Sequence, residues 1–425
     1  MERKIEKFLQ KWQKDIIRKP LILYGPKQVG KSYSALEFGK TNYKNTIYFN
    51  TSNNKAIEEI FKKERATNKI VLNLSLLSGE TILPDDTLII LDNLNSLDIV
   101  RGLKLFGSEH SDYHIIGITS RRDNLTKFKG EELQFKSMSE MDFEEFLWAH
   151  NEKALADLIR ESFTKHKTCP FHKLALELFQ EYLLTGGLPE VIDASLQGKT
   201  EQQLDIIKQK ILEVYERELI TCTTLIDIPR GLEVIESLPE QLRKENKKFQ
   251  YGVLGTGRRA KEYESTINYL VNNQIVYRSY KISTVKSPLS SCREKDSFKL
   301  YLPDDGLLSS MLHTNLKQLL SDEKIKEILY ENSIAKALAE AGYALYYYQS
   351  EGKAEVNFVI QNRMGKIIPI ELITKSDSKA KSLSVFMKKF TVMEAYRVTE
   401  NNFATKKEVR YIPIYAMFCL NDNQM

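Results

Sequence analysis

A glycine-bearing loop between an apolar strand and a helix is the feature that most limits the folds open to this chain. Residues 21–24 (LILY) are apolar and strand-sized, and the loop Gly25–Ser32 fits the pattern G-x-x-x-x-G-K-[ST]. The glycines let the backbone turn tightly, so that several N–H groups face one point near the positive N-terminus of the helix predicted from Lys31 to about Gly39. In this context the pattern predicts a phosphate-binding loop in a sheet of parallel strands.

The positions of this loop have expected roles. Lys31 neutralises the β- and γ-phosphates, and the Ser32 hydroxyl is a ligand of Mg²⁺. The sequence therefore predicts that ATP or ADP binds here with Mg²⁺. The predicted nucleotide-binding residues are Gly25, Pro26, Lys27, Gln28, Val29, Gly30, Lys31, Ser32 and Tyr33.

A second apolar strand, at residues 88–91, ends in the carboxylate of Asp92. This is the expected form of the second Mg²⁺ element, so Ser32 and Asp92 are the predicted metal-binding residues. The next residue is Asn93, where hydrolytic ATPases of this type usually carry a glutamate that acts on the attacking water. An amide cannot accept a proton near neutral pH, and loss of general-base help costs a factor of about 10²–10⁴. We interpret Asn93 as a degenerate catalytic position and expect nucleotide binding with slow turnover.

A further apolar strand, at residues 114–119, ends in Thr119 and Ser120. A hydroxyl at this place can sense the γ-phosphate, so both residues are candidate catalytic-site residues, although Thr-Ser at a strand end also commonly starts a turn. Arg121 and Arg122 follow, and they have two readings as well. One of them acts as an arginine finger across a subunit boundary, or both belong to a solvated basic turn, which we favour.

Strand and helix signals alternate through the first 120 residues, which indicates a parallel sheet covered by helices on both faces. The remaining strands of this region are predicted at 46–50 and 70–74, with helices at 54–65 and 98–106.

The rest of the chain reads as three further sections. Residues from 142 to about 219 are helical and form a predicted lid on the sheet. A small module follows, with helices at 238–244 and 261–272 and with strands at 276–282 and 298–302 that pair as a wing. The last section is mixed α/β, with a helix at 329–341 and strands at 345–349, 355–360, 367–373 and 411–418. The predicted domains are 1–150, 151–225, 226–312 and 313–425.

Composition limits the remaining function classes. The chain is 42% hydrophobic and 28% charged, the balance of a folded soluble protein, and 425 residues suit about three domains. A net charge of +5 is too small to argue nucleic-acid binding for the whole chain. No apolar run approaches the roughly 20 residues of a membrane helix, and the charged N-terminal segment lacks an apolar signal core. We therefore expect a cytoplasmic protein without a membrane partner. Four widely spaced cysteines predict neither a zinc site nor disulfides.

The chain as a whole resembles prokaryotic AAA-type P-loop ATPases whose C-terminal half is a domain of unknown function with a restriction-endonuclease-like core. The resemblance covers nearly the whole chain. The matching segments, in order, are LILYGPKQVGKS, LIILDNLNS, DYHIIGITS, MDFEEFLWA, YLLTGGLPEVI, LPEQLRKENKKFQY, FKLYLPDDGLL, YENSIAKALAE, AEVNFVI and IIPIELI. The resemblance implies an ATPase sheet domain, a helical lid, a winged-helix-like module and a nuclease-like end.

The nuclease-like end departs from the family pattern at the positions that carry chemistry. The family's usual E-V-D-F and I-E-x-K place an aspartate and a lysine where this chain has Asn357 and Ile373, and only Glu371 is retained. An uncharged amide is a poor Mg²⁺ ligand, and isoleucine does no proton chemistry. Rescue by Glu355, Lys375 and Glu331 requires a shifted metal. We therefore favour a catalytically dead fold kept for packing or for holding a partner.

DNA and a protein partner remain open alternatives. Cations gather at 243–248 and 258–261 in the winged-helix-like module, where the helix beginning near Arg259 would read a groove and Tyr277–Lys281 would supply the wing. Glu245, Glu262 and Glu264 dilute this patch, and a solvated charged face explains it equally well.

The sequence leads to a fold class and to ranked functions. The fold class is α/β, a P-loop NTPase of AAA type with the three additions named above. The favoured function is ATP binding as a conformational switch. The alternatives are an active ATPase working on DNA, a non-enzymatic scaffold and an ATP-regulated nuclease. The sequence does not decide the oligomeric state.

Overall fold

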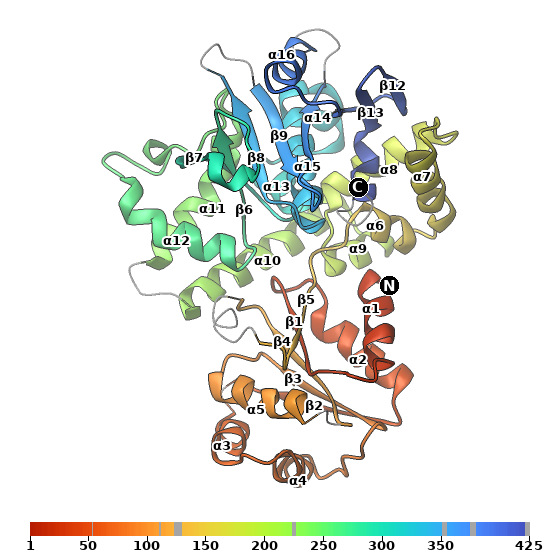
Figure 1. Cartoon of the computed structure of the whole chain (residues 1–425), viewed down its shortest axis with the longest axis vertical. Helices are drawn as coiled ribbons and strands as arrows, with labels where there is room; N and C mark the ends of the chain where they lie inside the picture. Colours follow the sequence, from red (N-terminus) through yellow and green to blue (C-terminus); the bar gives the residue numbers. More distant parts are fainter. Residues whose placement is uncertain are drawn as a thin grey trace. The chain divides into compact units, whose positions relative to one another are not determined.

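The computed structural model of the chain describes residues 1–52, 54–109, 112–122, 130–222, 227–350, 355–374 and 380–420. It contains two compact units (Figure 1). The first, called the N-terminal unit here, comprises Glu2–Ser139 and Asn272–Gln274. The second, the C-terminal unit, comprises Glu140–Val271 and Ile275–Met425 together with Met1.

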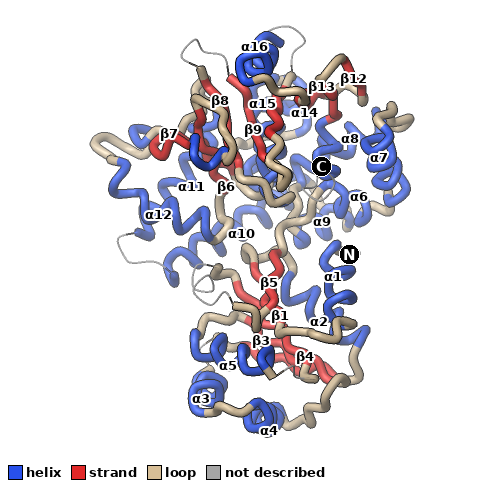
Figure 2. Tube along the Cα trace, viewed as in Figure 1, coloured by secondary structure: helices blue, strands red, loops and turns tan. Residues whose placement is uncertain are grey.

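The N-terminal unit is a five-stranded parallel sheet with helices on both faces (Figures 1 and 2). The strand order is β2-β3-β4-β1-β5. Its strands are β1 (Leu21–Tyr24), β2 (Asn45–Asn50), β3 (Thr87–Asp92), β4 (His114–Thr119) and β5 (Gln134–Ser137). Its helices are α1 (Lys4–Gln13), α2 (Lys31–Asn42), α3 (Lys55–Lys63), α4 (Thr67–Ser78) and α5 (Leu97–Ser108).

Alternating apolar side chains explain why helices cover both faces of this sheet. Leu21 and Leu23 of β1 pack in one hydrophobic cluster with α1 and α2, whereas Ile22 between them packs in another with α3, α4 and α5. Ile89 and Ile90 of β3 divide between the two clusters in the same way. Successive residues of a strand point to opposite faces, so a continuous apolar run marks a strand that is buried on both sides.

One predicted strand is wrong. Residues 70–74 lie in the helix α4, not in the sheet. Their buried members are Ile70, Val71 and Leu74, and this spacing of one and three residues lies along one face of a helix rather than of a strand. The strands predicted at 21–24, 46–50, 88–91 and 114–119 are confirmed, and β5 supplies the fifth place in the sheet.

The C-terminal unit contains helices and an eight-stranded mixed sheet. The strand order of this sheet is β12-β13-β11-β10-β9-β8-β6-β7. Its strands are β6 (Tyr277–Ile282), β7 (Arg293–Tyr301), β8 (Leu345–Gln349), β9 (Glu355–Gln361), β10 (Ile367–Leu372), β11 (Ala395–Thr399), β12 (Ala404–Lys406) and β13 (Val409–Pro413).

The helices of this unit confirm the predicted helical section and the predicted helices beyond it. The first group is α6 (Phe143–Ala149), α7 (Lys153–Lys165), α8 (His172–Thr185), α9 (Pro189–Leu196), α10 (Glu201–Cys222), α11 (Asp227–Arg243) and α12 (Ala260–Asn272). The second is α13 (Asp305–Met311), α14 (Leu316–Ser321), α15 (Glu323–Glu340) and α16 (Ala380–Phe390), with 3₁₀ turns η2 (Tyr251–Val253), η3 (Leu289–Cys292) and η4 (Ile414–Cys419).

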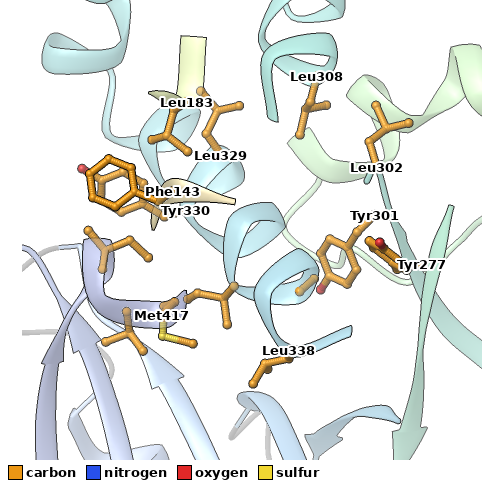
Figure 3. Close-up of a cluster of buried hydrophobic side chains, with 14 of the residues drawn as sticks. Phe143, Leu183, Tyr277, Tyr301, Leu302, Leu308, Leu329, Tyr330, Leu338 and Met417 are labelled. Atoms are coloured by element: carbon orange, nitrogen blue, oxygen red, sulfur yellow. The ribbon is translucent and has the colours of Figure 1, made fainter. Parts of the chain in front are cut away.

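A single large hydrophobic core runs through the C-terminal unit. Figure 3 shows Phe143 of α6 and Leu183 of α8 beside Leu329 and Tyr330 of α15, with Met417 in the same cluster. The sequence segments 151–225, 226–312 and 313–425 all contribute to this core. The three segments therefore pack around one common core.

The two strands predicted to pair as a wing do pair, but the ribbon is not separate from the rest of the unit. Strands β6 and β7 pair in antiparallel fashion, and β6 also pairs in parallel with β8. The ribbon therefore continues the large sheet as its edge. The strand predicted at 411–418 is correct only to Pro413, because residues 414–419 form the turn η4. None of the helices in the described residues combines the length and the apolar character of a membrane-spanning segment.

Candidate nucleotide site

The carboxyl edge of the N-terminal sheet gathers the loops that the sequence singled out. The loop after β1 is the predicted phosphate-binding loop. Strand β3 ends at Asp92 and is followed by Asn93, and β4, which lies between β1 and β3, ends at Thr119. In parallel sheets, ligands bind at the carboxyl edge, at the point where the connections after two strands lead to helices on opposite faces of the sheet. Here β1 is followed by a helix on one face, whereas β2 and β3 are followed by helices on the other.

The backbone of the loop has the conformation that its glycines permit. Gly25 has φ +151° and lies so close to the chain at Met138 that a Cβ atom would stand 1.9 Å from the Met138 carbonyl oxygen. No side chain fits in that space. Gln28 has φ +65°, and Gly30, with φ +91°, caps the N-terminus of α2.

Lys31 begins α2 and is buried. Its ammonium donates to the carbonyl oxygens of Gly25, at 2.8 Å, and of Pro26. Ser32 is half-buried in the same helical turn, and Tyr33 is 60% exposed on its outer side. The loop therefore closes around the ammonium group that the sequence assigns to phosphate.

The donor set at this edge fits a nucleoside triphosphate with its cation. A buried ammonium, a hydroxyl and the N-terminus of α2 are donors of the kind that phosphate oxygens accept from. The Asp92 carboxylate nearby in the sheet is the hard oxygen ligand that Mg²⁺ prefers. Bound Mg²⁺ would supply charge neutralisation of the phosphates, and Ser32 and Asp92 would hold it.

Asp92 is held by its neighbours. It is 5% exposed, and its Oδ2 accepts from the Tyr48 hydroxyl of β2 at 2.8 Å, while its Oδ1 accepts from the backbone N–H of Asn93 at 2.7 Å. Burial, followed by the hydrogen bond to Asp92, raises the pKa of Tyr48 to about 12. Tyr48 was not predicted as a site residue. The signal that points to it is a polar residue near the carboxyl end of β2, the strand paired with β3.

Asn93 occupies the left-handed region with φ +58°. Asparagine is among the few residues other than glycine that visit this region readily, whereas glutamate does not. The Asn93 amide donates to the Asn50 side chain at 3.2 Å, and the Thr51 hydroxyl donates to the carbonyl oxygens of Asp92 at 2.9 Å and Asn93 at 3.0 Å. The backbone thus gives a physical reason for an amide at this position.

Thr119 ends β4 with its hydroxyl in a local turn. Its Oγ1 accepts from the backbone N–H of Arg121 at 3.0 Å, and its carbonyl oxygen accepts from the N–H of Gly25 at 3.3 Å. Thr119 is buried, and Ser120 after it is half-buried. The hydroxyl of Thr119 therefore acts as a turn starter in this structure, and its carbonyl ties β4 to the first residue of the loop.

Arg3 is a second site residue that the sequence did not reveal. It caps α1 and is buried, with Nη1 donating to the Val29 carbonyl at 2.7 Å and Nη2 to the Ser139 carbonyl at 2.8 Å. One guanidinium thus joins the loop to the last residue before the chain enters the C-terminal unit. No sequence pattern announces this contact, because its partners lie 26 and 136 residues away.

The position of the first family carboxylate in the C-terminal unit belongs to a buried ionic cluster. The Asn357 amide of β9 donates to Glu331 of α15 at 3.2 Å. Glu331 also accepts from Lys247 at 2.7 Å, Lys299 at 3.1 Å and the Tyr301 hydroxyl at 2.7 Å. Burial alone would raise the pKa of Glu331, but the two ammonium groups outweigh burial and hold it well below its usual range. Two lysine ammonium groups therefore pair with Glu331, and the same two groups also pair with Glu327 and Glu355.

Glu371 has different partners. Its carboxylate accepts from Nε of Arg397 at 2.9 Å and from the backbone N–H of Leu383 in α16 at 3.3 Å. The next predicted position, Ile373, continues the backbone pairing with Val398. Lys375, the predicted rescue residue, lies outside the described residues. In the described part of the chain, no group of three or more His, Cys, Asp and Glu side chains gathers for a metal ion.

The basic segments are only partly open to a partner. Lys247 is buried in the ionic cluster, Arg258 pairs with Glu233 at 2.7 Å, and Arg243 donates to the Leu312 carbonyl at 3.2 Å. Arg259 and Lys261 are exposed at the start of α12. The patch that appears continuous in the sequence is therefore divided in the structure.

Three segments of the chain match models of protein families. Residues 17–147 match an AAA domain, and two domains of unknown function follow, DUF8612 at residues 176–318 and DUF4143 at residues 326–417. An AAA domain is a P-loop ATPase domain, so this match indicates ATP binding and nucleotide-dependent activity. A comparison with curated proteins found no match.

Solved structures with similarity to the chain include Drosophila ORC bound to AT-rich DNA and Cdc6, with 10% identity over 75% of this chain and 91% of that one. The E. coli MS115-1 HORMA:CdnC:Trip13 complex shows 14% identity over 36% and 66%, and the Pyrococcus furiosus Hef helicase domain shows 14% over 66% and 81%. The TM-scores are 0.23, 0.20 and 0.19, which do not establish a shared fold over the whole chain.

Proposed function

We propose that the chain binds ATP with Mg²⁺ at the carboxyl edge of the N-terminal sheet, hydrolyses it slowly, and uses the bound nucleotide as a conformational switch. Lys31 binds phosphate, Ser32 and Asp92 hold the cation, and the loop backbone of Gly25–Ser32 lines the phosphates. At the end of β4, Thr119 or Ser120 responds to the γ-phosphate, and the Thr119 hydroxyl also accepts from the backbone N–H of Arg121.

The observation that carries slow hydrolysis is the state of Asn93. Its position follows the Mg²⁺ carboxylate directly, its backbone is left-handed, and its amide is bonded to Asn50. This group can hold a water but cannot take its proton. Relative to an ordinary enzymatic turnover of ~10 s⁻¹, loss of a general base predicts about 10²–10⁴-fold slower turnover.

Two substitutions of Asn93 by side chains of equal length test this interpretation. Asn93→Glu adds a carboxylate, whereas Asn93→Gln adds the same methylene group with an amide, and both incur the same backbone strain. We expect Asn93→Glu to release phosphate faster than both wild type and Asn93→Gln. Equal rates in the two variants, or wild-type turnover near 10 s⁻¹ that disappears in Lys31→Ala, would contradict the proposal.

The nuclease alternative receives no support from the C-terminal unit. The Asn357 amide donates to the Glu331 carboxylate, which is already paired with two lysines, and Glu371 is paired with Arg397. We expect no plasmid cleavage by the purified protein with Mg²⁺ or Mn²⁺. Cleavage that is lost on Glu371→Ala would establish the alternative.

A further inference from the structure

The carboxyl end of β2 lies beside the proposed cation site. In the pairing of β2 with β3, Asn50 is opposite Asp92 and Tyr48 is opposite Ile90. Three polar side chains of β2 and the residue after it reach the turn that ends β3. Tyr48 bonds to the Asp92 carboxylate, Asn50 to the Asn93 amide, and Thr51 to both carbonyls of the turn.

These contacts give the two oxygens of Asp92 one donor each. The Tyr48 hydroxyl stands 2.8 Å from Oδ2, and the Asn93 N–H stands 2.7 Å from Oδ1. An ionised carboxylate has about four lone-pair sites, so two donors fix its orientation and leave positions for a cation or its water. A ligand held in this way needs no reordering when the cation arrives.

The chemistry of Tyr48 suits a fixed neutral donor. A phenol hydroxyl is uncharged near neutral pH and can donate a hydrogen bond to a carboxylate. It adds no positive charge that would repel Mg²⁺. An arginine or lysine at this place would neutralise the carboxylate, as Arg397 neutralises Glu371 in the C-terminal unit.

We propose that Tyr48 is a positioning residue for the cation: it holds the Asp92 carboxylate in the orientation that receives Mg²⁺ with the nucleotide. This proposal rests on the proposed function, since it assigns a role within the same site. Asn50 and Thr51 complete the support by fixing the Asn93 turn that supplies the second donor. The strand β2 thereby contributes to the site although none of its residues belongs to the loop pattern.

The test compares nucleotide affinity with and without the cation in the full-length protein. ATP affinity is measured by calorimetry in EDTA and in Mg²⁺ buffer, for wild type and Tyr48→Phe. Loss of a supporting partner of a metal ligand typically costs 10–100-fold in metal affinity. We expect the affinity in EDTA to stay within about twofold and the gain produced by Mg²⁺ to fall by about tenfold.

Tyr43→Phe is the matched control, because it removes another tyrosine hydroxyl from the same sheet unit. The Tyr43 hydroxyl bonds to His114, not to Asp92. An unchanged Mg²⁺ gain in Tyr48→Phe, or equal losses in both variants, would overturn the role of Tyr48 while leaving nucleotide binding intact. A wild-type protein that binds no nucleotide would overturn the proposed function and this role with it. Residue Tyr48 is 40% exposed and Tyr48→Phe only removes an oxygen atom, so phenylalanine is sterically accommodated.

Discussion

Asn93 stands in a backbone conformation that constrains what can replace it. With φ +58°, a residue that has a Cβ atom and no local polar compensation costs about 1–2 kcal/mol, whereas glycine pays no such cost. We therefore expect Asn93→Ala to be less stable than Asn93→Gly by about 1 kcal/mol, as measured from thermal unfolding of the two variants. Alanine and glycine variants of equal stability would contradict this prediction, because they would show that residue 93 can leave the left-handed conformation without cost.

His114 makes the stability of the N-terminal unit depend on pH. Its ring nitrogens contact the Tyr43 hydroxyl at 2.6 Å and Asp85 at 3.1 Å. Burial, with help from the Arg18 guanidinium, lowers the pKa of His114 from 6.5 to about 4, although Asp85 opposes the shift. As the pH falls, His114 takes up a proton in the unfolded chain near pH 6.5, but in the folded chain only near pH 4. The stability that comes from keeping His114 neutral is therefore fully present above pH 6.5 and is lost as the pH falls towards 4.

The size of this effect is about 1–2 kcal/mol once solvent screening is allowed for. Denaturant unfolding between pH 7 and pH 4 measures this change in unfolding free energy. Carboxylates also titrate in this range, and comparison with His114→Gln subtracts their contribution. We expect the variant to lose less stability over this range than wild type. Parallel pH profiles of the two proteins would contradict the assignment.

At the scale of elements, α1 supports the loop through Arg3. Arg3→Met keeps the length of the side chain but removes the donors to the Val29 and Ser139 carbonyls. Hydrogen bonds from charged groups contribute about 1.5–3 kcal/mol each, so we expect faster amide exchange at residues 25–32 and weaker ATP binding. Lys40→Met, in an exposed part of α2, is the control. Unaltered exchange in Arg3→Met would mean that the loop is held without this contact.

The ionic cluster around Glu331 ties elements of the C-terminal unit together. Burial alone would lower the pKa of Lys299, but Glu331 and Glu355 outweigh it and raise the pKa above its usual value. Lys299→Met removes one of the two ammonium groups that pair with the buried Glu331 carboxylate, while Lys247 remains, and we expect a loss of about 1–3 kcal/mol in unfolding free energy. Lys295→Met, an exposed position on the same strand, should change stability by less than about 0.5 kcal/mol. Similar losses in both variants would refute a special role for the cluster.

The elements also show why some predictions succeeded. The strands at 21–24, 88–91 and 114–119 are continuous apolar runs, which local sequence displays. The run at 70–74 is also apolar, but its period is helical. The strand β5 contains half-buried and exposed residues and no apolar run, so the sequence offers no signal for it.

At the scale of the whole molecule, the sequence predicted the loop and missed what supports it. Gly25, Lys31 and Asp92 belong to local patterns, and the structure places them at one edge of the sheet. Tyr48 and Arg3 act through contacts with residues far along the chain, which no local pattern records. The segments predicted as lid, winged-helix-like module and nuclease-like end likewise share one core that only tertiary packing reveals.

The central claim is that this chain holds ATP with Mg²⁺ and turns it over slowly. A single-turnover experiment, with protein in excess over γ-labelled ATP in Mg²⁺ buffer, measures both bound nucleotide and its lifetime. We predict ATP that stays bound and intact with a half-life between about ten seconds and ten minutes, and at least tenfold weaker binding in Lys31→Ala. Wild-type protein that retains no nucleotide, or that converts it within a fraction of a second, would contradict the account.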